Sequence, residues 1–187
     1  LNLDEVLRSI HLLNDPKGFG LGARRMTLST VGIVPGIERL ARSGLEVGLA
    51  ISLHAPTDEL RSRLVPMNRK YPLGPLLAAC HEYTERTHRR VTFEYAMIDG
   101  VNDSPAQADA LAWLLQGLRS HVNLIPINPV PDLPYQPAPR ERVLAFERRL
   151  REQGINATLR ISRGADIQAG CGQLRRAPTE CQTSVNV

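Results

Sequence analysis

The sequence predicts an α/β fold built on a parallel sheet, and three observations lead to that class. Strand-like runs alternate with helix-like runs along most of the 187 residues, as repeated βαβ units require. Each connection between strands is long enough for a crossover helix, which parallel strands need. Five strands are too few to close an eight-stranded (β/α) barrel, so an open doubly wound sheet and an incomplete barrel both remain.

The predicted elements follow one another regularly. An amphipathic helix begins at Leu3, with further apolar residues at Val6, Leu7 and Ile10. The expected strands are 25–30, 47–52, 91–97, 122–127 and 157–162, and the helices between them include 37–41, 72–88, 102–118 and 143–150. Ser104 before Pro105 is typical of a helix start. The glycines of 18–22 leave a helix and enter a strand, which favours a turn over a phosphate loop.

Composition excludes several classes of protein. Apolar residues make up 42% and charged residues 22%, which are ordinary globular values and argue against disorder. No apolar run approaches the roughly 20 residues of a membrane helix, and we identify no signal peptide. The first residue is leucine and a helical pattern starts at once, so we expect the chain to be part of something longer.

Charge is distributed unevenly. Residues 1–138 carry 14 basic and 14 acidic side chains, whereas residues 139–176 carry nine arginines and four acids. Guanidinium groups suit phosphate, so we expect the last third to carry a basic surface. Base composition of the gene accounts for the scarcity of lysine, but it does not account for this clustering.

The three cysteines form no recognisable metal motif. Their odd number favours a reducing compartment, and their spacing predicts no metal site in this chain. Cys80 falls on the apolar stripe of a helix and is interpreted as a buried core residue. Cys171 lies between two glycines with arginines nearby, which favours a reactive thiolate, although a surface cysteine without a role remains open. Cys181 lies in the tail.

Short polar residues occur where the predicted strands end. Ser29, the Ser52-Leu53-His54 run and Asn128 all fall at such positions. Because the carboxyl ends of parallel strands form one edge, these residues predict a site for a polar small molecule. Glu94 lies in the middle of a strand, and no role is assigned to it.

Seven segments together resemble a known family. They are NLDEV (2–6), GFGLGARRMTLSTVGIVPGI (18–37), LAISLHAPTDELR (49–61), VPMNRKYPL (65–73), FEYAMIDGVNDSP (93–105), NLIPINPVP (123–131) and RGADIQAGCGQL (163–174). In this order they resemble the bacterial dual-specificity RNA methyltransferases of the radical S-adenosylmethionine (SAM) superfamily. That family methylates carbon 2 of an adenine in 23S rRNA and in tRNA.

The resemblance implies a fold and a set of domains. It predicts a partial (β/α) barrel of the radical-SAM type whose first strands are missing from this chain, with a C-terminal strand and a basic tail. Residues 1–135 would form the C-terminal part of the barrel. Residues 136–176 would form an extension that carries the cysteine loop, and residues 177–187 a disordered tail.

The resemblance also implies roles for individual residues. Ser29, Ser52, Leu53, His54 and Asn128 would contact SAM. Cys171 would carry the methyl group. The predicted RNA-binding residues are Arg160, Arg163, Arg175 and Arg176.

The chemistry implied by the resemblance explains why a cysteine is needed. Carbon 2 of adenine has no lone pair to attack a sulfonium methyl group, so the family first methylates a cysteine with one SAM and then cleaves a second SAM on a [4Fe-4S] cluster. The implied partners are 23S rRNA, tRNA and an external electron donor, with no membrane. A cytoplasmic protein, monomeric at full length, is expected.

Departures from the family pattern leave other interpretations open. The CxxxCxxC cluster motif is absent, so the cluster ligands are not in this chain and the isolated chain is expected to be inactive. Ala165, Gln168 and Gly170 differ from the family's usual residues before the methyl-carrying cysteine. A non-catalytic RNA-binding remnant is one alternative. An aldolase or isomerase barrel is another, but no lysine lies at a strand end to serve it.

Overall fold

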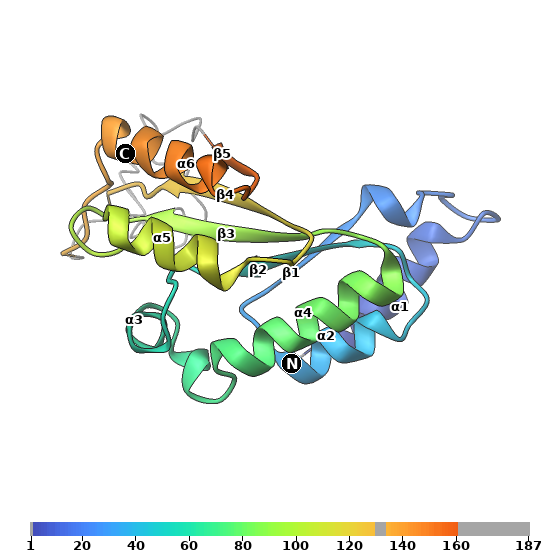
Figure 1. Ribbon diagram of the computed structural model, residues 1–187. Helices are drawn as coiled ribbons and strands as arrows, with labels where there is room; N and C mark the ends of the chain where they lie inside the picture. Colours follow the sequence, from blue (N-terminus) through green and yellow to red (C-terminus); the bar gives the residue numbers. More distant parts are fainter. Residues whose placement is uncertain (1, 130–133, 161–187) are drawn as a thin grey trace, which may run out of the picture.

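A five-stranded parallel sheet runs through the centre of the protein (Figure 1). The computed structural model describes residues 2–129 and 134–160. The strands are β1 (Thr27–Thr30), β2 (Gly48–Ser52), β3 (Val91–Met97), β4 (Ser120–Pro126) and β5 (Ala157–Leu159). They lie in the order β1-β2-β3-β4-β5, and every neighbouring pair is parallel. The predicted α/β class is therefore confirmed.

Helices connect the strands in sequence. The connecting helices are α2 (Val34–Ala41), α3 (Asp58–Leu64), α4 (Leu73–Thr87), α5 (Pro105–Leu114) and α6 (Arg140–Glu152), and α1 (Leu3–Asn14) precedes β1. Each crossover advances by one strand in the same direction, and right-handed crossovers of this kind place all their helices on one face of the sheet. This arrangement is that of an incomplete barrel, because a doubly wound sheet reverses its order and has helices on both faces.

The burial pattern of β3 distinguishes the two faces of the sheet. Val91, Phe93, Tyr95 and Met97 are fully buried beneath the helices, whereas the residues between them are half-buried. Side chains alternate between the faces of a strand, so one face is apolar and covered by helices while the other is the concave face of the partial barrel. We call this second face the polar face, since Ser29, Thr92, Glu94, Asn123 and Thr158 lie on it by register.

Cys80 belongs to the core between α4 and the sheet. Its side chain is fully buried within the main hydrophobic cluster. Burial raises the pKa of the thiol to about 12, so the group is neutral at physiological pH. The interpretation of Cys80 as a structural residue is confirmed.

Several element boundaries differ from the predicted ones. β1 begins at Thr27, two residues later than expected, because a short 3-10 helix occupies Ala23–Arg25. β4 begins at Ser120, two residues earlier. α5 ends at Leu114, and Leu115 and Leu118 are buried in the turn that follows. α3 was not predicted as a separate helix, since seven residues are too few to show a clear apolar period.

Helix starts follow the local capping chemistry. At α5 the Ser104 hydroxyl accepts a hydrogen bond from the Gln107 backbone, and the Gln107 side chain accepts one from the Ser104 backbone. This capping box satisfies two N–H groups that the helix itself leaves free. The start predicted at Ser104 and Pro105 is confirmed.

Two further features of the described residues concern membrane helices and the edges of the sheet. No helix in it is both long enough and apolar enough to cross a membrane. On its outer side β1 pairs with no other described strand. β5 extends the same sheet beyond β4, within the segment expected to form the C-terminal extension.

Candidate functional site

The polar face brings together side chains from neighbouring strands. Ser52 of β2 pairs in register with Glu94 of β3, which pairs with Asn123 of β4, which pairs with Thr158 of β5. Residues in register on parallel strands project from the same side of the sheet. A continuous row of polar groups therefore crosses four strands on the concave face.

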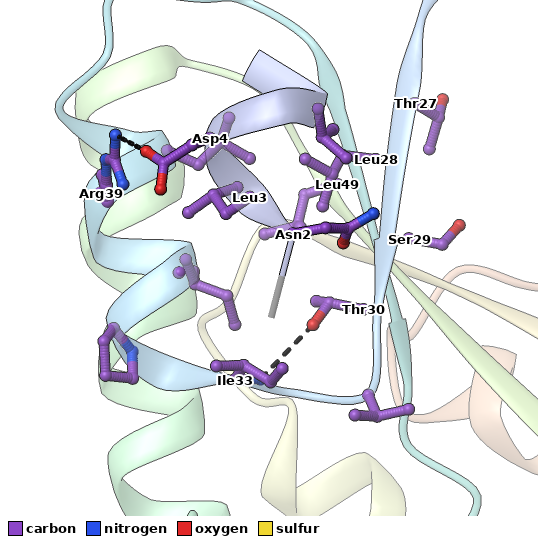
Figure 2. A pocket seen from close by; sticks show the side chains of 16 residues that line it. Asn2, Leu3, Asp4, Thr27, Leu28, Ser29, Thr30, Ile33, Arg39 and Leu49 are labelled. Carbon is purple, nitrogen blue, oxygen red and sulfur yellow. Dashed lines mark hydrogen bonds and ion pairs between the residues drawn. The ribbon is translucent and has the colours of Figure 1, made fainter. Parts of the chain in front are cut away.

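Ser29 lies on the polar face of the edge strand. It is exposed, and Figure 2 shows its side chain on the opposite side of β1 from Leu28. Ser29 pairs in register with Ala50, two residues before Ser52 on β2. The hydroxyl groups of Ser29 and Ser52 thus lie on adjacent strands and on the same face.

The turn after β2 is held by backbone contacts with β3. Leu53 is fully buried, and its N–H donates to the Glu94 carbonyl at 3.0 Å. His54 adopts a left-handed backbone with φ of 60°, an uncommon conformation for a residue other than glycine. Contact of Leu53 with a ligand stays a prediction, because the whole residue, backbone included, is buried.

The His54 imidazole is neutral and its tautomer is fixed. Its Nδ1 accepts a hydrogen bond from the Ala96 N–H at 3.0 Å, so the ring proton lies on Nε2. Burial, together with the positive charge of Arg61, lowers the pKa of His54 to about 4. At neutral pH this residue can donate one hydrogen bond from Nε2 to a ligand.

Asn102 ties the His54 turn to the end of β3. Its side-chain amide is fully buried and donates to the carbonyls of His54 at 2.8 Å and Ala96 at 2.6 Å. Its Oδ1 accepts from the Ile98 N–H at 2.8 Å. In the sequence, Asn102 only marks the start of a predicted helix. Its bridging role is visible only in the structure.

Arg61 of α3 fastens the carboxyl ends of β1 and β2. The whole residue is buried. Its Nη2 donates to the Val31 carbonyl at 2.8 Å and the Ser52 carbonyl at 3.0 Å, and its Nε donates to the Leu53 carbonyl at 3.1 Å. Nη1 donates to Asn68 Oδ1 at 2.8 Å. Four hydrogen bonds therefore compensate a buried cation that forms no ion pair with a described residue.

Gly32 leaves room for this guanidinium. Its φ is +98°, and an added Cβ would lie 3.1 Å from Arg61 Nη2 and from a Leu76 methyl group. A side chain at this position would strain the backbone and displace Arg61 from the Val31 carbonyl. Sequence reasoning missed Arg61, although it closes one of the segments that carry the family resemblance.

The remaining predicted site residues are placed only in part. Asn128 is half-buried, two residues beyond β4 and therefore near the carboxyl edge. Arg160 is exposed at the end of β5, where its N–H donates to the Leu124 carbonyl at 2.8 Å. Cys171, Arg163, Arg175 and Arg176 lie outside the described residues, as do Cys181 and the tail predicted to be disordered.

Acidic neighbours neutralise part of the expected basic surface. Arg142 pairs with Asp99 at 2.5 Å and Asp103 at 2.6 Å, and Arg149 pairs with Asp109 at 2.5 Å. Arg160 forms no ion pair with another described residue. The charge count of the last third therefore overstates the cationic surface that α6 presents.

A cavity lies beside the edge strand β1, between that strand and the first two helices, α1 and α2. It measures about 690 Å³. Figure 2 shows Leu3, Leu28 and Leu49 in it, with an ion pair between Asp4 and Arg39 at its rim. Its lining is mostly apolar and includes Ser29, but neither Ser52 nor His54 lines it.

Comparisons with known proteins extend this description. No protein-family model matches the chain. The probable dual-specificity RNA methyltransferase RlmN of Geobacillus kaustophilus is 51% identical over 174 residues, which cover 93% of this chain and 48% of that protein. The corresponding protein of Symbiobacterium thermophilum is 53% identical over 176 residues, covering 93% of this chain and 47% of that protein. The chain spans about half the length of these curated relatives.

Two solved structures share the fold. A radical SAM methyltransferase from Sphaerobacter thermophilus has a TM-score of 0.89 and 56% identity, and the match covers 92% of this chain and 50% of that one. A domain of pyruvate-formate lyase-activating enzyme from Bacteroides vulgatus has a TM-score of 0.63 at 18% identity, covering 85% of this chain and 93% of that one. The second likeness shows the fold alone.

The sheet topology and these matches show a partial-barrel α/β fold like that of radical SAM enzymes. Within that class it is a homologue of the RlmN dual-specificity RNA methyltransferases, over about half of their length. The resemblance found in the sequence is confirmed.

Replacing Arg61 with lysine should strongly destabilise the fold. A single ammonium group cannot reach the four separate acceptors, so at least two charge-assisted hydrogen bonds are lost, each worth about 1.5 kcal/mol or more. We expect the free energy of unfolding to fall by at least about 3 kcal/mol in urea titrations. The control Arg63→Lys, at an exposed position of the same helix, should stay within about 0.5 kcal/mol. Equal stabilities would contradict the role of Arg61.

Burial of neutral His54 predicts an acid-sensitive stability. The pKa is about 4 in the folded protein and about 6.5 in an unfolded chain, so below about pH 6.5 the unfolded state binds more protons. The free energy of unfolding should therefore fall with pH, by about 2 kcal/mol at about pH 5 from this residue. His54→Asn, which tolerates the left-handed backbone, should lose that contribution. Identical pH profiles of the two proteins in urea titrations would refute this.

Proposed function

We propose that the full-length product of the gene encoding this chain is a radical SAM methyltransferase that methylates carbon 2 of an adenine in 23S rRNA and in tRNA, in the cytoplasm. The observation that carries the proposal is the 51% identity to a dual-specificity RNA methyltransferase across 93% of the chain. That alignment takes in nearly the whole sheet and its polar face.

The polar face fits SAM as a ligand. SAM presents ribose hydroxyls, an α-ammonium, a carboxylate and an adenine, and therefore needs both donors and acceptors. His54 offers a neutral N–H donor, and Ser29 and Ser52 offer hydroxyl groups that can act as either. Glu94 Oε2 is a buried acceptor without a hydrogen-bond partner. We assign Ser29, Ser52, Leu53, His54 and Asn128 to SAM, with Leu53 contributing by holding the turn that carries Ser52 and His54.

The described residues do not fit an iron-sulfur cluster. They contain no group of three or more His, Cys, Asp or Glu side chains that could hold a metal ion. Cys80, the cysteine among them, is buried in the core. A [4Fe-4S] cluster supplies the electron for reductive cleavage of SAM in radical SAM chemistry. In our proposal its ligands come from residues outside this chain.

Cys171 is the residue that we assign to methyl transfer. Its thiolate takes the methyl group from the sulfonium of SAM, which yields S-methylcysteine and S-adenosylhomocysteine. A thiolate is required because a neutral thiol is a poor nucleophile, and the nearby arginines in the sequence favour the ionised form. The methyl carbon is thereby held on the protein before it reaches adenine, a positioning role that this chain can fill.

Replacing Cys171 with alanine should abolish adenine methylation. Because the thiol acts on the methyl group and adds little binding energy, RNA affinity should change less than about threefold. The full-length protein purified with its cofactors is incubated with SAM and 23S rRNA or tRNA, and the methylated nucleosides are measured by mass spectrometry. The control Cys181→Ala should retain activity. Methylation that survives in Cys171→Ala would contradict the proposed function.

The predicted RNA-binding arginines should govern the salt dependence of RNA binding. Each phosphate contact releases counterions, so affinity falls with salt more steeply when more contacts form. Replacing Arg160, Arg163, Arg175 and Arg176 by glutamine should reduce the slope of log affinity against log salt by up to about 3. Arg149→Gln is the control, since Asp109 already pairs with Arg149. An unchanged slope in the quadruple variant would remove this surface from RNA binding.

A further inference from the structure

Only one of the two carboxyl oxygens of Glu94 has a hydrogen-bond partner among the described residues. Glu94 lies in the middle of β3 on the polar face, and its Oε1 accepts a hydrogen bond from Asn123 Nδ2 at 2.9 Å. Its Oε2 is buried and has no hydrogen-bond partner. Buried polar atoms are paired in the great majority of cases in native proteins, so an acceptor left over calls for a donor from elsewhere.

A directed chain of hydrogen bonds fixes the carboxyl group. Thr158 Oγ1 donates to Asn123 Oδ1 at 3.3 Å, and His121 Nε2 lies 2.9 Å from Thr158 Oγ1. Since the Thr158 hydroxyl donates to Asn123, it accepts from His121, and Asn123 in turn donates to Glu94. Every donor in the chain points towards Glu94, which is its final acceptor.

Glu94 lies in the same polar row as Ser52. Its side-chain hydrogen-bond partner, Asn123, comes from β4. On the other side of Glu94, the residue of β2 that pairs with it in register is Ser52. The backbone of Glu94 also holds the turn, because its carbonyl accepts from the Leu53 N–H. One residue thus joins the polar row to the Ser52-Leu53-His54 turn.

We propose that Glu94 is a ligand-binding residue whose Oε2 accepts a hydrogen bond from an O–H or N–H group of the adenosyl ligand. This inference rests on the proposed function, which assigns SAM to the polar face. Three groups of SAM supply the donor chemistry: the ribose diol, the adenine 6-amino group and the α-ammonium. Asn123, Thr158 and His121 are positioning residues that hold Oε1, which leaves the buried Oε2 as the acceptor without a partner among the described residues.

Binding of S-adenosylhomocysteine tests this role without turnover. Titration calorimetry compares the full-length wild type with Glu94→Gln, which keeps the shape of the side chain but removes the carboxylate. We expect affinity to fall at least tenfold, which corresponds to about 1.4 kcal/mol. Glu85→Gln, at an exposed position of α4, is the matched control and should stay within twofold. Thermal midpoints of both variants establish that they are folded.

A second probe identifies the donor. 5′-Methylthioadenosine keeps the ribose but lacks the amino-acid part of SAM. If Glu94→Gln weakens its binding as strongly as that of S-adenosylhomocysteine, the donor lies in the adenosine part, on a ribose hydroxyl or on the adenine 6-amino group. If only S-adenosylhomocysteine is affected, the donor is the α-ammonium. Thr158→Val should weaken both probes less than Glu94→Gln does, because it removes only a positioning contact.

The possible outcomes distinguish a failure of the role of Glu94 from a failure of the proposed function. Wild-type protein that binds S-adenosylhomocysteine while folded Glu94→Gln binds it equally well overturns the role of Glu94 and leaves the proposed function standing. Wild-type protein that binds neither probe overturns the proposed assignment of SAM to this face, and the inference falls with it.

Discussion

The carboxyl edge of the sheet depends on one buried guanidinium. Arg61 donates hydrogen bonds to carbonyl oxygens after β1, at the end of β2 and in the turn that follows β2, all of which are partly or fully buried. The fork of the guanidinium matches acceptors that lie in different directions, which a point charge cannot do. The positions of Ser52 and His54 relative to Ser29 follow from this arrangement.

The charge of Arg61 also affects the chemistry of its neighbour. Together with burial it keeps His54 neutral, and the Ala96 N–H fixes which ring nitrogen carries the proton. The Asn102 side chain stabilises the same turn by donating a hydrogen bond to the His54 carbonyl. The backbone groups here are mostly satisfied within the protein, so the side chains on the polar face are left for a ligand.

Sequence patterns could predict the parallel α/β class because they depend on local alternation. Helical and strand periods are visible in any short window, and polar residues at strand ends follow from the same reading. The choice between a doubly wound sheet and a partial barrel could not be made in this way, since it depends on strand order. The sequence resemblance supplied that choice, and the observed order agrees with it.

Other features needed the three-dimensional structure. Arg61 lies among charged residues in a short helix, so its sequence context is that of a surface residue. Glu94 acquires a meaning only when the register places it beside Ser52 and Asn123. The ion pairs of Arg142 and Arg149 on α6 were not foreseen because their acidic partners are about 40 residues away in sequence. Long-range pairing is invisible to a count of charges.

We propose that the polar face, and not the mostly apolar cavity beside β1, holds the adenosyl ligand. A crystal structure of the full-length protein with S-adenosylhomocysteine decides between the two sites. We expect electron density for the ligand against Ser52 and His54, neither of which lines that cavity, on the concave side of the sheet. Density for the ligand in the cavity between α1, α2 and β1, with the polar face empty, would contradict it.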